Sequence, residues 1–288
     1  MMKIRLGGVP EHFNLPIQLA IEQGIFAKNG FEIDWQYFPG GTGAMTKALD
    51  EESLDMAILL TEGFVAARNK GLKAKIVKSY IDSPLVWGIF TGSHSPIQSI
   101  YDGGEKKYAI SRFGSGSHLM AMIHAQQRGE EIKPENWLVI NDMKTAAEKL
   151  KTNEADIFYW EKYTAKPYVV DGSMLQIGEF AAPWSGFLMV ANELFLAKNE
   201  TAVQSFLVLI NEITQHFKND SFFQQTVCTR FDLTENEMKH WIKSTIWNNN
   251  FSIKAQGIHN AIHSLQAVSD AALTTDLSFY CTPLVELK

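Results

Sequence analysis

The chain has 288 residues, of which 45% are hydrophobic and 20% charged, and its formal net charge is -6 at pH 7. This composition is typical of a globular protein and excludes wholesale disorder and fibrous repeats, while the length suggests one large or two medium domains. We expect no nucleic-acid partner, because neutralising phosphates needs a concentrated basic surface that a mildly acidic chain without a Lys/Arg cluster lacks. Two cysteines, Cys228 and Cys281, are too few for a zinc ribbon or a disulfide framework, so we expect buried thiols.

The N-terminus begins directly with a strand pattern and lacks the apolar core and small-residue cleavage site of a signal peptide. No segment reaches the roughly 18 consecutive apolar residues of a membrane span, so we expect no integral membrane protein. We therefore expect either a periplasmic or otherwise extracytoplasmic protein whose signal was removed, or a cytoplasmic protein.

Strands and helices alternate over the first 80 residues. The predicted strands are Lys3–Val9, Glu32–Phe38, Asp55–Leu60 and Lys73–Ile81, and the predicted helices are Pro16–Lys28, Ala44–Glu51 and Glu62–Asn69. In the first helix, apolar residues recur at helical spacing, and Gly24 marks its exit. Repeated β-α-β units of this size predict a mostly parallel sheet covered by helices.

A second, similar series begins near Leu85 and gives way to a helical tail after Asn192. Its predicted strands are Leu85–Thr91, Lys107–Ser111, Trp137–Asn141, Asp156–Trp160, Met174–Phe180 and Phe187–Ala191, and its predicted helices are His118–Arg128, Met143–Lys151 and Ala165–Val170. The predicted tail helices are Thr201–Phe217, Phe222–Thr229, Glu235–Thr245 and Gly257–Ala272, and we expect no strand among them. Thr234 with Glu237 three residues later predicts a capping box.

The predicted fold class is α/β with two lobes, each a mostly parallel sheet flanked by helices, and a helical C-terminal tail. No Gly/Ser- or Pro-rich linker separates the blocks, which are joined by extended apolar segments near 82–91 and 183–191. Two such crossings predict that 1–85 and 188–288 form one discontinuous lobe and that 86–187 form the other, with a hinge at the crossings. A cleft between lobes is where small-molecule sites form preferentially.

Catalytic and nucleotide-binding motifs are absent from the sequence: it contains no G-x-G-x-x-G, G-x-x-x-x-G-K-[ST], G-x-S-x-G or H-E-x-x-H. His259 and His263 lie four apart on one predicted helix, but no carboxylate or cysteine at a suitable offset completes a metal site. Cys228 has no identifiable histidine partner, and we expect a small buried hydrophobe there. We therefore predict no catalytic residue, no metal and no cofactor.

The strongest local signal is the run S-R-F-G-S-G-S-H from Ser111 to His118, between a predicted strand and a predicted helix. Glycine lets the backbone turn sharply and approach a ligand, and the free N–H groups of a helix start favour an anion. The candidate ligand-binding residues in this run are Arg112, Gly114, Ser115, Gly116, Ser117 and His118. The residues alone favour equally an anion-binding loop, with His118 as a donor, and an ordinary helix cap made by Ser117.

Pro39–Gly43 has the same strand-to-helix position in the first block, with Gly41 and Thr42 as candidate ligand-binding residues. Taken alone, this run is typical of an ordinary turn. Two such loops, one in each block, are more informative together, because each could present a helix N-terminus to a shared cleft.

Further candidates follow predicted strands or lie on the return crossing, and ligands of parallel sheets bind outside the carboxyl ends of the strands. These candidates are Glu11, His12, Phe13, Asn14, Thr61, Glu62, Trp160, Glu161 and Trp184. Either tryptophan could cover the ligand body, although most tryptophans pack in cores. Glu11, Glu62 or Glu161 could receive an amine.

The order of these features resembles the opening of one large family. The runs Val9–Pro16, Ala20–Phe26 and Gly30–Ile33, with Gly40–Gly43 as a Gly-rich turn and Leu54–Ala57 as an acidic strand entry, carry the resemblance. The chain is similar over roughly 3–190 to the solute-binding proteins of sulfonate, taurine and nitrate ABC transporters and to the related thiamine-pyrimidine-precursor binding proteins. Gly114–His118 resembles the G-S-x-x-H loop with which sulfonate-binding members hold their anionic group.

The resemblance implies a two-lobed type II periplasmic-binding-protein fold that closes on a small molecule by hinge motion. It implies non-catalytic binding, by a monomer, of a small organic anion that is sulfonate-like or aromatic with an amine, with an ABC permease as partner. In this interpretation Ser115, Ser117 and His118 hold the anion, and Gly41 and Thr42 close from the other lobe.

The alternative is a cytoplasmic enzyme on the same fold, of the thiamine-pyrimidine or menaquinone-precursor type, that uses a glutamate or histidine as acid or base. The Cys-rich and histidine features of the pyrimidine-forming enzymes are not seen in this sequence, and its opening does not match the menaquinone enzymes. A sensory ligand-binding domain ranks last, since these residues contain no output domain.

Overall fold

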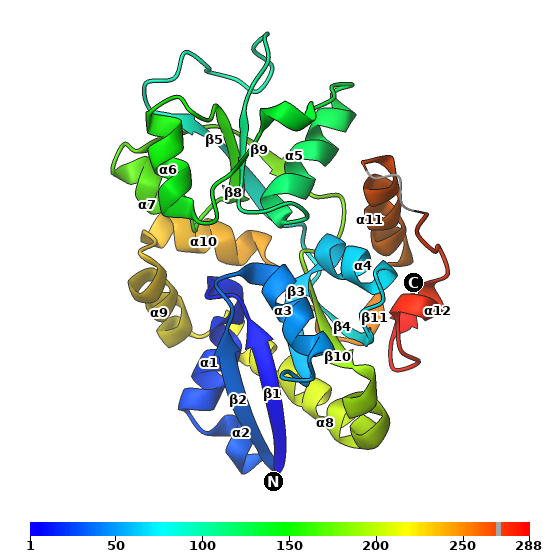
Figure 1. The fold of residues 1–288 in the computed structure, drawn as a ribbon. Helices are drawn as coiled ribbons and strands as arrows, with labels where there is room; N and C mark the ends of the chain where they lie inside the picture. The colour runs from blue at the N-terminus through cyan, green and yellow to red at the C-terminus, as the bar shows by residue number, and fades with distance from the viewer. Residues whose placement is uncertain (269–271) are drawn as a thin grey trace. The chain divides into compact units, whose positions relative to one another are not determined.

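A computed structural model describes residues 1–268 and 272–288, which divide into two compact units (Figure 1). The first unit comprises Met1–Pro84, Trp184–Ile262 and Leu273–Lys288, and the second comprises Leu85–Pro183 and His263–Ala272. The chain therefore leaves the first unit after Pro84 and re-enters it at Trp184, and the segment from His263 groups with the second unit rather than with the rest of the tail.

The first unit is built on a five-stranded sheet with the order β2-β1-β3-β10-β4. Its strands are β1 (Met2–Gly8), β2 (Phe31–Tyr37), β3 (Met56–Leu60), β4 (Ala74–Ile81) and β10 (Phe187–Asn192). β1 pairs in parallel with β2 and β3, whereas β10 pairs antiparallel with β3 and β4. β3 and β10 are almost wholly buried. Helices cover both faces of these central strands, which explains why their sequences are continuous apolar runs without alternation.

Helices and short strands complete this part of the chain. They are the 3-10 turn His12–Asn14 and helices α1 (Leu15–Glu22), α2 (Ile25–Lys28), α3 (Gly41–Asp50), α4 (Thr61–Asn69), α8 (Glu193–Lys218), α9 (Ser221–Phe231), α10 (Glu235–Ser244), α11 (Ala255–Ala267) and α12 (Leu277–Tyr280), with strands β11 (Ser252–Ile253) and β12 (Glu286–Leu287). Two sequence predictions were wrong here. One helix over Pro16–Lys28 is split, because Gly24 adopts a left-handed φ of 67° between α1 and α2. The helix expected over Ala44–Glu51 begins earlier, at Gly41, and ends at Asp50.

The tail also differs from expectation, because β11 and β12 pair in parallel where no strand was predicted. Two-residue strands show no alternating pattern in a sequence, so periodicity cannot detect them. The helix expected over Gly257–Ala272 ends at Ala267, and 269–271 of that prediction lie outside the described residues. The capping box of Thr234 and Glu237 is confirmed, with both of its reciprocal hydrogen bonds present at the start of α10.

The second unit contains a sheet with the order β7-β6-β8-β5-β9. Its elements are β5 (Val86–Gly92), β6 (Tyr108–Ile110), α5 (Gly116–Gln127), the 3-10 turn Pro134–Asn136, β7 (Trp137–Val139), α6 (Met143–Lys151), β8 (Ile157–Glu161), α7 (Lys166–Val170) and β9 (Met174–Ala181). β6 pairs in parallel with β7 and β8, and β5 pairs antiparallel with β8 and β9. The core packs Ala146, Ala147 and Leu150 of α6 with Phe90 and Phe158 of the sheet.

Both sheets confirm the prediction of an α/β fold with mostly parallel strands. In each sheet four strands run in one direction and one runs opposite. The exceptions are β5 and β10, which are the strands entered directly after the chain passes from one unit to the other. Among the helices of the described residues, none combines the length and apolar character that crossing a bilayer would require.

Candidate functional site

The loop before α5 is held in shape by its own hydroxyl groups. Ser115 is the N-cap of α5, and its Oγ accepts a hydrogen bond from the backbone N–H of His118. The Ser117 hydroxyl accepts from the backbone N–H of Ser111 at 3.0 Å and lies 3.0 Å from the Ser115 hydroxyl. The helix cap is therefore Ser115, and the expectation that Ser117 makes it was wrong. Both hydroxyls are buried and engaged within the loop.

The start of α5 leaves two backbone donors unpaired. The N–H groups of Gly116 and Ser117 make no hydrogen bond to any described residue, as expected for the first turn of a helix. Gly114 adopts a left-handed φ of 75°, and its N–H donates to Nδ1 of His118 at 3.1 Å. Unpaired N–H groups at the start of a helix are donors of the kind that binds anions.

His118 contributes a donor rather than a charge. Burial lowers its pKa to about 4, so the imidazole is neutral at pH 7. Because Nδ1 accepts from Gly114, the proton of the neutral ring resides on Nε2, which is the atom available to donate. The ring contacts Phe113 and Trp137 edge to face, with centroids 5.3 Å and 4.7 Å away.

Arg112 supplies the positive charge at the loop. Its guanidinium is half-buried and has no ion pair or hydrogen bond with any other described residue. Burial without an opposite charge lowers its pKa from the ordinary arginine value, yet an arginine remains protonated at all physiological pH values. A half-buried cation without a partner is costly, and an anionic ligand would remove that cost.

Phe113 is a residue that sequence reasoning missed. Its side chain is 62% exposed, beside Arg112 and against His118. A large exposed aromatic side chain in a donor-rich loop offers a contact surface for the apolar part of a ligand. Its place between Arg112 and Gly114 is the only signal in the sequence that could have indicated this role.

A second group of predicted residues meets at the carboxyl end of β3. Thr61 Oγ1 donates to the carbonyl of Ser185 at 2.5 Å, and the indole N–H of Trp184 donates to Glu62 Oε2 at 2.8 Å. Thr42 Oγ1 accepts from the backbone N–H of Leu60 at 3.1 Å. The structure thus brings Thr42, Thr61, Glu62 and Trp184 together within the first unit.

This group depends on close approach between α3 and α4. A Cβ atom on Gly63 would lie only 2.5 Å from Cγ2 of Thr42, so a glycine is needed there. Gly41 opens α3 with a left-handed φ of 64°, and no side chain caps that helix. The first N–H groups of α3 are consequently not satisfied by a cap.

Glu62 is the most perturbed carboxyl of this group. Its side chain is buried, and burial raises its pKa to about 7, although hydrogen bonds from its own backbone and from Trp184 act in the opposite direction. Oε2 has the indole as partner, whereas Oε1 is buried and has no hydrogen-bond partner among the described residues. Such an atom calls for an explanation, since buried polar atoms are normally paired.

The residues after β1 are placed in the core instead. Glu11 is half-buried, and His12, Phe13 and Asn14 are buried. The His12 ring stacks on Trp241 with centroids 4.4 Å apart and an interplanar angle of 10°, and burial lowers its pKa to about 3. The Asn14 amide donates to the carbonyl of Val9 at 2.9 Å. These contacts give the three buried side chains a packing role.

The remaining candidates in the second unit have local partners. Glu161 is buried, and its Oε2 accepts from the backbone N–H of Thr164 at 2.8 Å and from the Thr164 hydroxyl, which closes a turn after β8. Trp160 is half-buried and stacks on Phe158 with centroids 5.2 Å apart.

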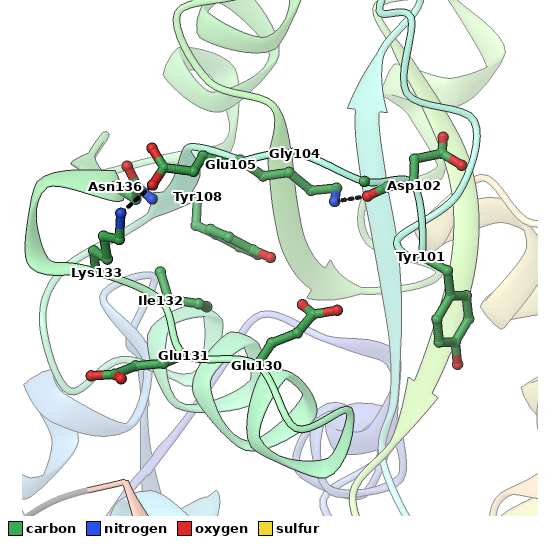
Figure 2. A pocket seen from close by; sticks show the side chains of 12 residues that line it. Tyr101, Asp102, Gly104, Glu105, Tyr108, Glu130, Glu131, Ile132, Lys133 and Asn136 are labelled. Carbon is green, nitrogen blue, oxygen red and sulfur yellow. Dashed lines mark hydrogen bonds and ion pairs between the residues drawn. The ribbon is translucent and has the colours of Figure 1, made fainter.

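A cavity of about 370 Å³ in the second unit contains none of the predicted site residues (Figure 2). Its lining residues are Tyr101, Asp102, Gly103, Gly104, Glu105, Lys106, Tyr108, Glu130, Glu131, Ile132, Lys133 and Asn136. Both lysines are engaged, Lys133 with the Glu105 carboxylate and Lys106 with the backbone carbonyl of Asp102 (Figure 2). With its lysines occupied and four carboxylates in its wall, this cavity does not suit an anion.

The described part of the chain offers no group of three or more His, Cys, Asp or Glu side chains that could hold a metal ion. Cys228 and Cys281 are both free thiols. Cys281 is buried, and burial raises its pKa to about 11, whereas Cys228 is only half-buried, contrary to expectation.

Comparison with known proteins identifies the fold of this chain. A family model described as Ca3427-like PBP matches residues 87–180. The structure is similar to that of the Candida albicans CA3427 gene product, which is described as exhibiting the generic periplasmic binding protein structural fold. The TM-score is 0.87 at 23% identity, and the match covers 96% of this chain and 93% of that chain. The chain has the periplasmic-binding-protein fold.

A second solved structure with this fold is the alkanesulfonate-binding protein SsuA from Xanthomonas axonopodis pv. citri bound to MOPS. Its TM-score is 0.74 at 15% identity, and the match covers 100% of this chain and 99% of that chain. The expected type II periplasmic-binding-protein fold of the sulfonate-binding proteins is confirmed.

A curated relative carries the name of an enzyme. The chain is 24% identical over 229 residues to 4-amino-5-hydroxymethyl-2-methylpyrimidine phosphate synthase THI11 of Saccharomyces cerevisiae. The match covers 73% of this chain and 65% of the relative, so the chain spans slightly less than two thirds of that protein's length.

Proposed function

We propose that this protein binds a small organic anion of the sulfonate class through the loop Arg112–His118, without transforming it. The observation that carries the proposal is the half-buried guanidinium of Arg112, which has no partner among the described residues, in the same loop as the unpaired N–H groups of Gly116 and Ser117. The structural likeness to an alkanesulfonate-binding protein bound to MOPS, a buffer that carries a sulfonate group, supports the same ligand class.

Each part of the loop has a task in this proposal. The guanidinium of Arg112 pairs with two oxygens of the anion, a planar arrangement that a lysine cannot reproduce. The N–H groups of Gly116 and Ser117 and Nε2–H of His118 donate to the remaining lone pairs. Phe113 contacts the carbon chain next to the anionic group. His118 donates as a neutral ring at pH 7, because burial lowers its pKa to about 4.

The structural likeness to binding proteins supports a proposal for the biological role. We propose that the protein acts as a monomer, as the solute-binding component of an ABC transporter with a permease as partner. A strain that lacks the protein would then lose uptake of the bound compound while keeping other uptake systems. Intact uptake in that strain would argue against the transport role but not against ligand binding.

Ligand binding is tested by calorimetric titration with ethanesulfonate, MOPS, sulfate and nitrate. The melting temperature is measured with each ligand as well, since a ligand that binds the folded state stabilises it. Arg112→Met should weaken sulfonate binding about 10- to 100-fold, the usual effect of losing a hydrogen bond from a charged group. Arg112→Lys should fall in between, and the exposed Lys144→Met on α6 serves as the charge-matched control. Unchanged affinity in Arg112→Met would contradict the proposal.

A second candidate function is favoured by the likeness to the yeast pyrimidine phosphate synthase. A phosphate ester is also a small anion, so the same loop could hold one. Mass spectrometry of candidate ligands before and after incubation with the protein separates the two functions. A ligand recovered unchanged supports binding alone, whereas a new mass that depends on the folded protein supports an enzyme.

A further inference from the structure

We propose that Trp137 is a positioning residue of the loop Arg112–His118, because its indole holds the imidazole of His118 in place beside Gly114. This inference rests on the proposed function and adds to it a residue that acts through His118 rather than on the ligand itself. All the residues that it involves belong to the second unit.

The contact between Trp137 and His118 carries the argument. The two rings meet edge to face, with centroids 4.7 Å apart and an interplanar angle of 72°, an arrangement that aromatic rings favour. A second ring against the imidazole is that of Phe113, which lies in the loop itself and is 62% exposed. Trp137 is half-buried and begins β7. Of the two rings, the indole is therefore the one that ties His118 to the sheet.

The indole is itself held by the neighbouring strand. β7 pairs in parallel with β6, and the pairing places Trp137 opposite Tyr108. Tyr108 is buried, and its ring contacts the indole with centroids 5.7 Å apart. Strand pairing fixes the backbone of Trp137, and the packing of Tyr108 restricts its side chain. The first turn of α5, which carries His118, thus rests on a fixed support.

The orientation of the imidazole matters to the loop in two ways. Nδ1 of His118 accepts from the N–H of Gly114 at 3.1 Å, and Gly114 has a left-handed φ of 75°. A rotation of the ring would take this acceptor away from Gly114 and would redirect Nε2–H. Loss of the indole would therefore disturb both the shape of the loop and one of its donors.

Trp137 also helps to keep the imidazole neutral. Burial, rather than a neighbouring charge, lowers the pKa of His118 to about 4. Removing the indole would expose the ring and return its pKa toward the ordinary value near 6.5. An imidazolium has no lone pair left to accept from Gly114. The charged side chains on the flanking elements are those of Arg112 in the loop and of Lys107, Glu135 and Glu154, which line a cavity together with Trp137.

The first measurement is a calorimetric titration with ethanesulfonate at pH 7.5. Trp137→Ala should weaken binding about three- to tenfold, less than the loss of Arg112, because the hydrogen bond from His118 is weakened rather than removed. Trp137→Phe, which keeps an aromatic ring against His118, should recover most of the affinity.

The matched control is Leu138→Ala, the next residue of β7. The Leu138 side chain packs against the core cluster that contains Phe90 and Phe158, so this variant should lose stability. It should nevertheless bind ethanesulfonate as the wild type does, because the contact between Trp137 and His118 is intact.

The second measurement is an NMR titration of the His118 ring, whose signal is identified by its absence in His118→Gln. The wild-type ring should stay neutral from pH 8 to about pH 5.5, because its pKa is about 4. In Trp137→Ala the ring should titrate within that range. Trp137→Phe and Leu138→Ala should behave like the wild type, since a general loss of packing does not expose His118.

The outcomes separate this inference from the proposed function. Unchanged ethanesulfonate affinity in Trp137→Ala overturns the positioning role and leaves the proposed function standing. The same holds if the titration of His118 stays as in the wild type, or if Leu138→Ala loses as much affinity as Trp137→Ala. If ethanesulfonate does not bind to the folded wild type, the proposed function itself fails.

Discussion

Replacing His12 by phenylalanine should remove a large part of the protein's sensitivity to acid. In the folded protein His12 is 2% exposed and stacked on Trp241, and burial lowers its pKa to about 3, against an ordinary value near 6.5. Between pH 6.5 and pH 3 the unfolded chain therefore binds a proton at this residue that the folded chain does not. Stability must fall as the pH falls through this window.

The magnitude follows from the width of that window. One pKa unit corresponds to about 1.4 kcal/mol, so His12 should cost the wild type about 2 kcal/mol of unfolding free energy between pH 6.5 and pH 5. His12→Phe keeps an aromatic ring against Trp241 but removes the titrating group. His118 and His124, whose pKa values burial lowers to about 4, are present in both proteins and cancel in the comparison.

The assay is urea denaturation of both proteins at pH 7 and at pH 5. The wild type should lose about 2 kcal/mol more than His12→Phe between the two pH values. Equal losses would refute the reasoning, because they would mean that His12 is protonated in the folded state. Sulfonate affinity should be the same in both proteins, since the structure gives His12 a packing role; a loss of affinity in a stable variant would restore the ligand-binding role that the sequence suggested.

Two further predictions concern glycines. Gly63→Ala should destabilise the protein by about 1–3 kcal/mol, because the new Cβ would lie 2.5 Å from Cγ2 of Thr42, whose Oγ1 accepts a hydrogen bond from the backbone N–H of Leu60. Adding Thr42→Ser, which keeps the hydroxyl and removes Cγ2, should recover most of the lost stability in thermal melts. A double variant as unstable as Gly63→Ala would contradict this contact. Gly114→Ala should lower the free energy of unfolding by about 1–2 kcal/mol, because Gly114 has a left-handed φ of 75°, although no atom lies near enough to clash with a new Cβ. A melting temperature equal to that of the wild type would show that the loop relaxes to another conformation.

Periodicity and local chemistry were sufficient for much of the fold. The bounds of α6 were predicted correctly because its inward alanines and leucine recur at helical spacing, and the structure adds that Asp142 caps its start. The reversed direction of β5 and β10 could not be predicted, since strand pairing depends on contacts between residues far apart in the sequence. The break at Gly24 was missed because a glycine within a helical pattern is compatible with both a kink and a continuous helix.

The candidate site was predictable in position but not in detail. The glycines and serines of 111–118 located the loop before α5, yet only the structure shows that the serine hydroxyls are used internally and that Arg112 has no partner among the described residues. Likewise, the sequence could not reveal that His12 is covered by Trp241, because that burial depends on a residue from a distant part of the chain. Local patterns identify chemical groups, whereas their availability is a tertiary property.

The position of β10 has a consequence for how the protein is made. This strand lies between β3 and β4, which are both synthesised long before it. A growing chain that has completed β4 can pair β1, β2 and β3, but β4 cannot join them until β10, which lies between β3 and β4, has been made. The second unit, whose sheet uses a single stretch of chain, can fold while the first waits. The sheet of the second unit can therefore be completed before that of the first, and until β10 is made β3 and β4 each present an unpaired edge, the feature of a strand that favours aggregation.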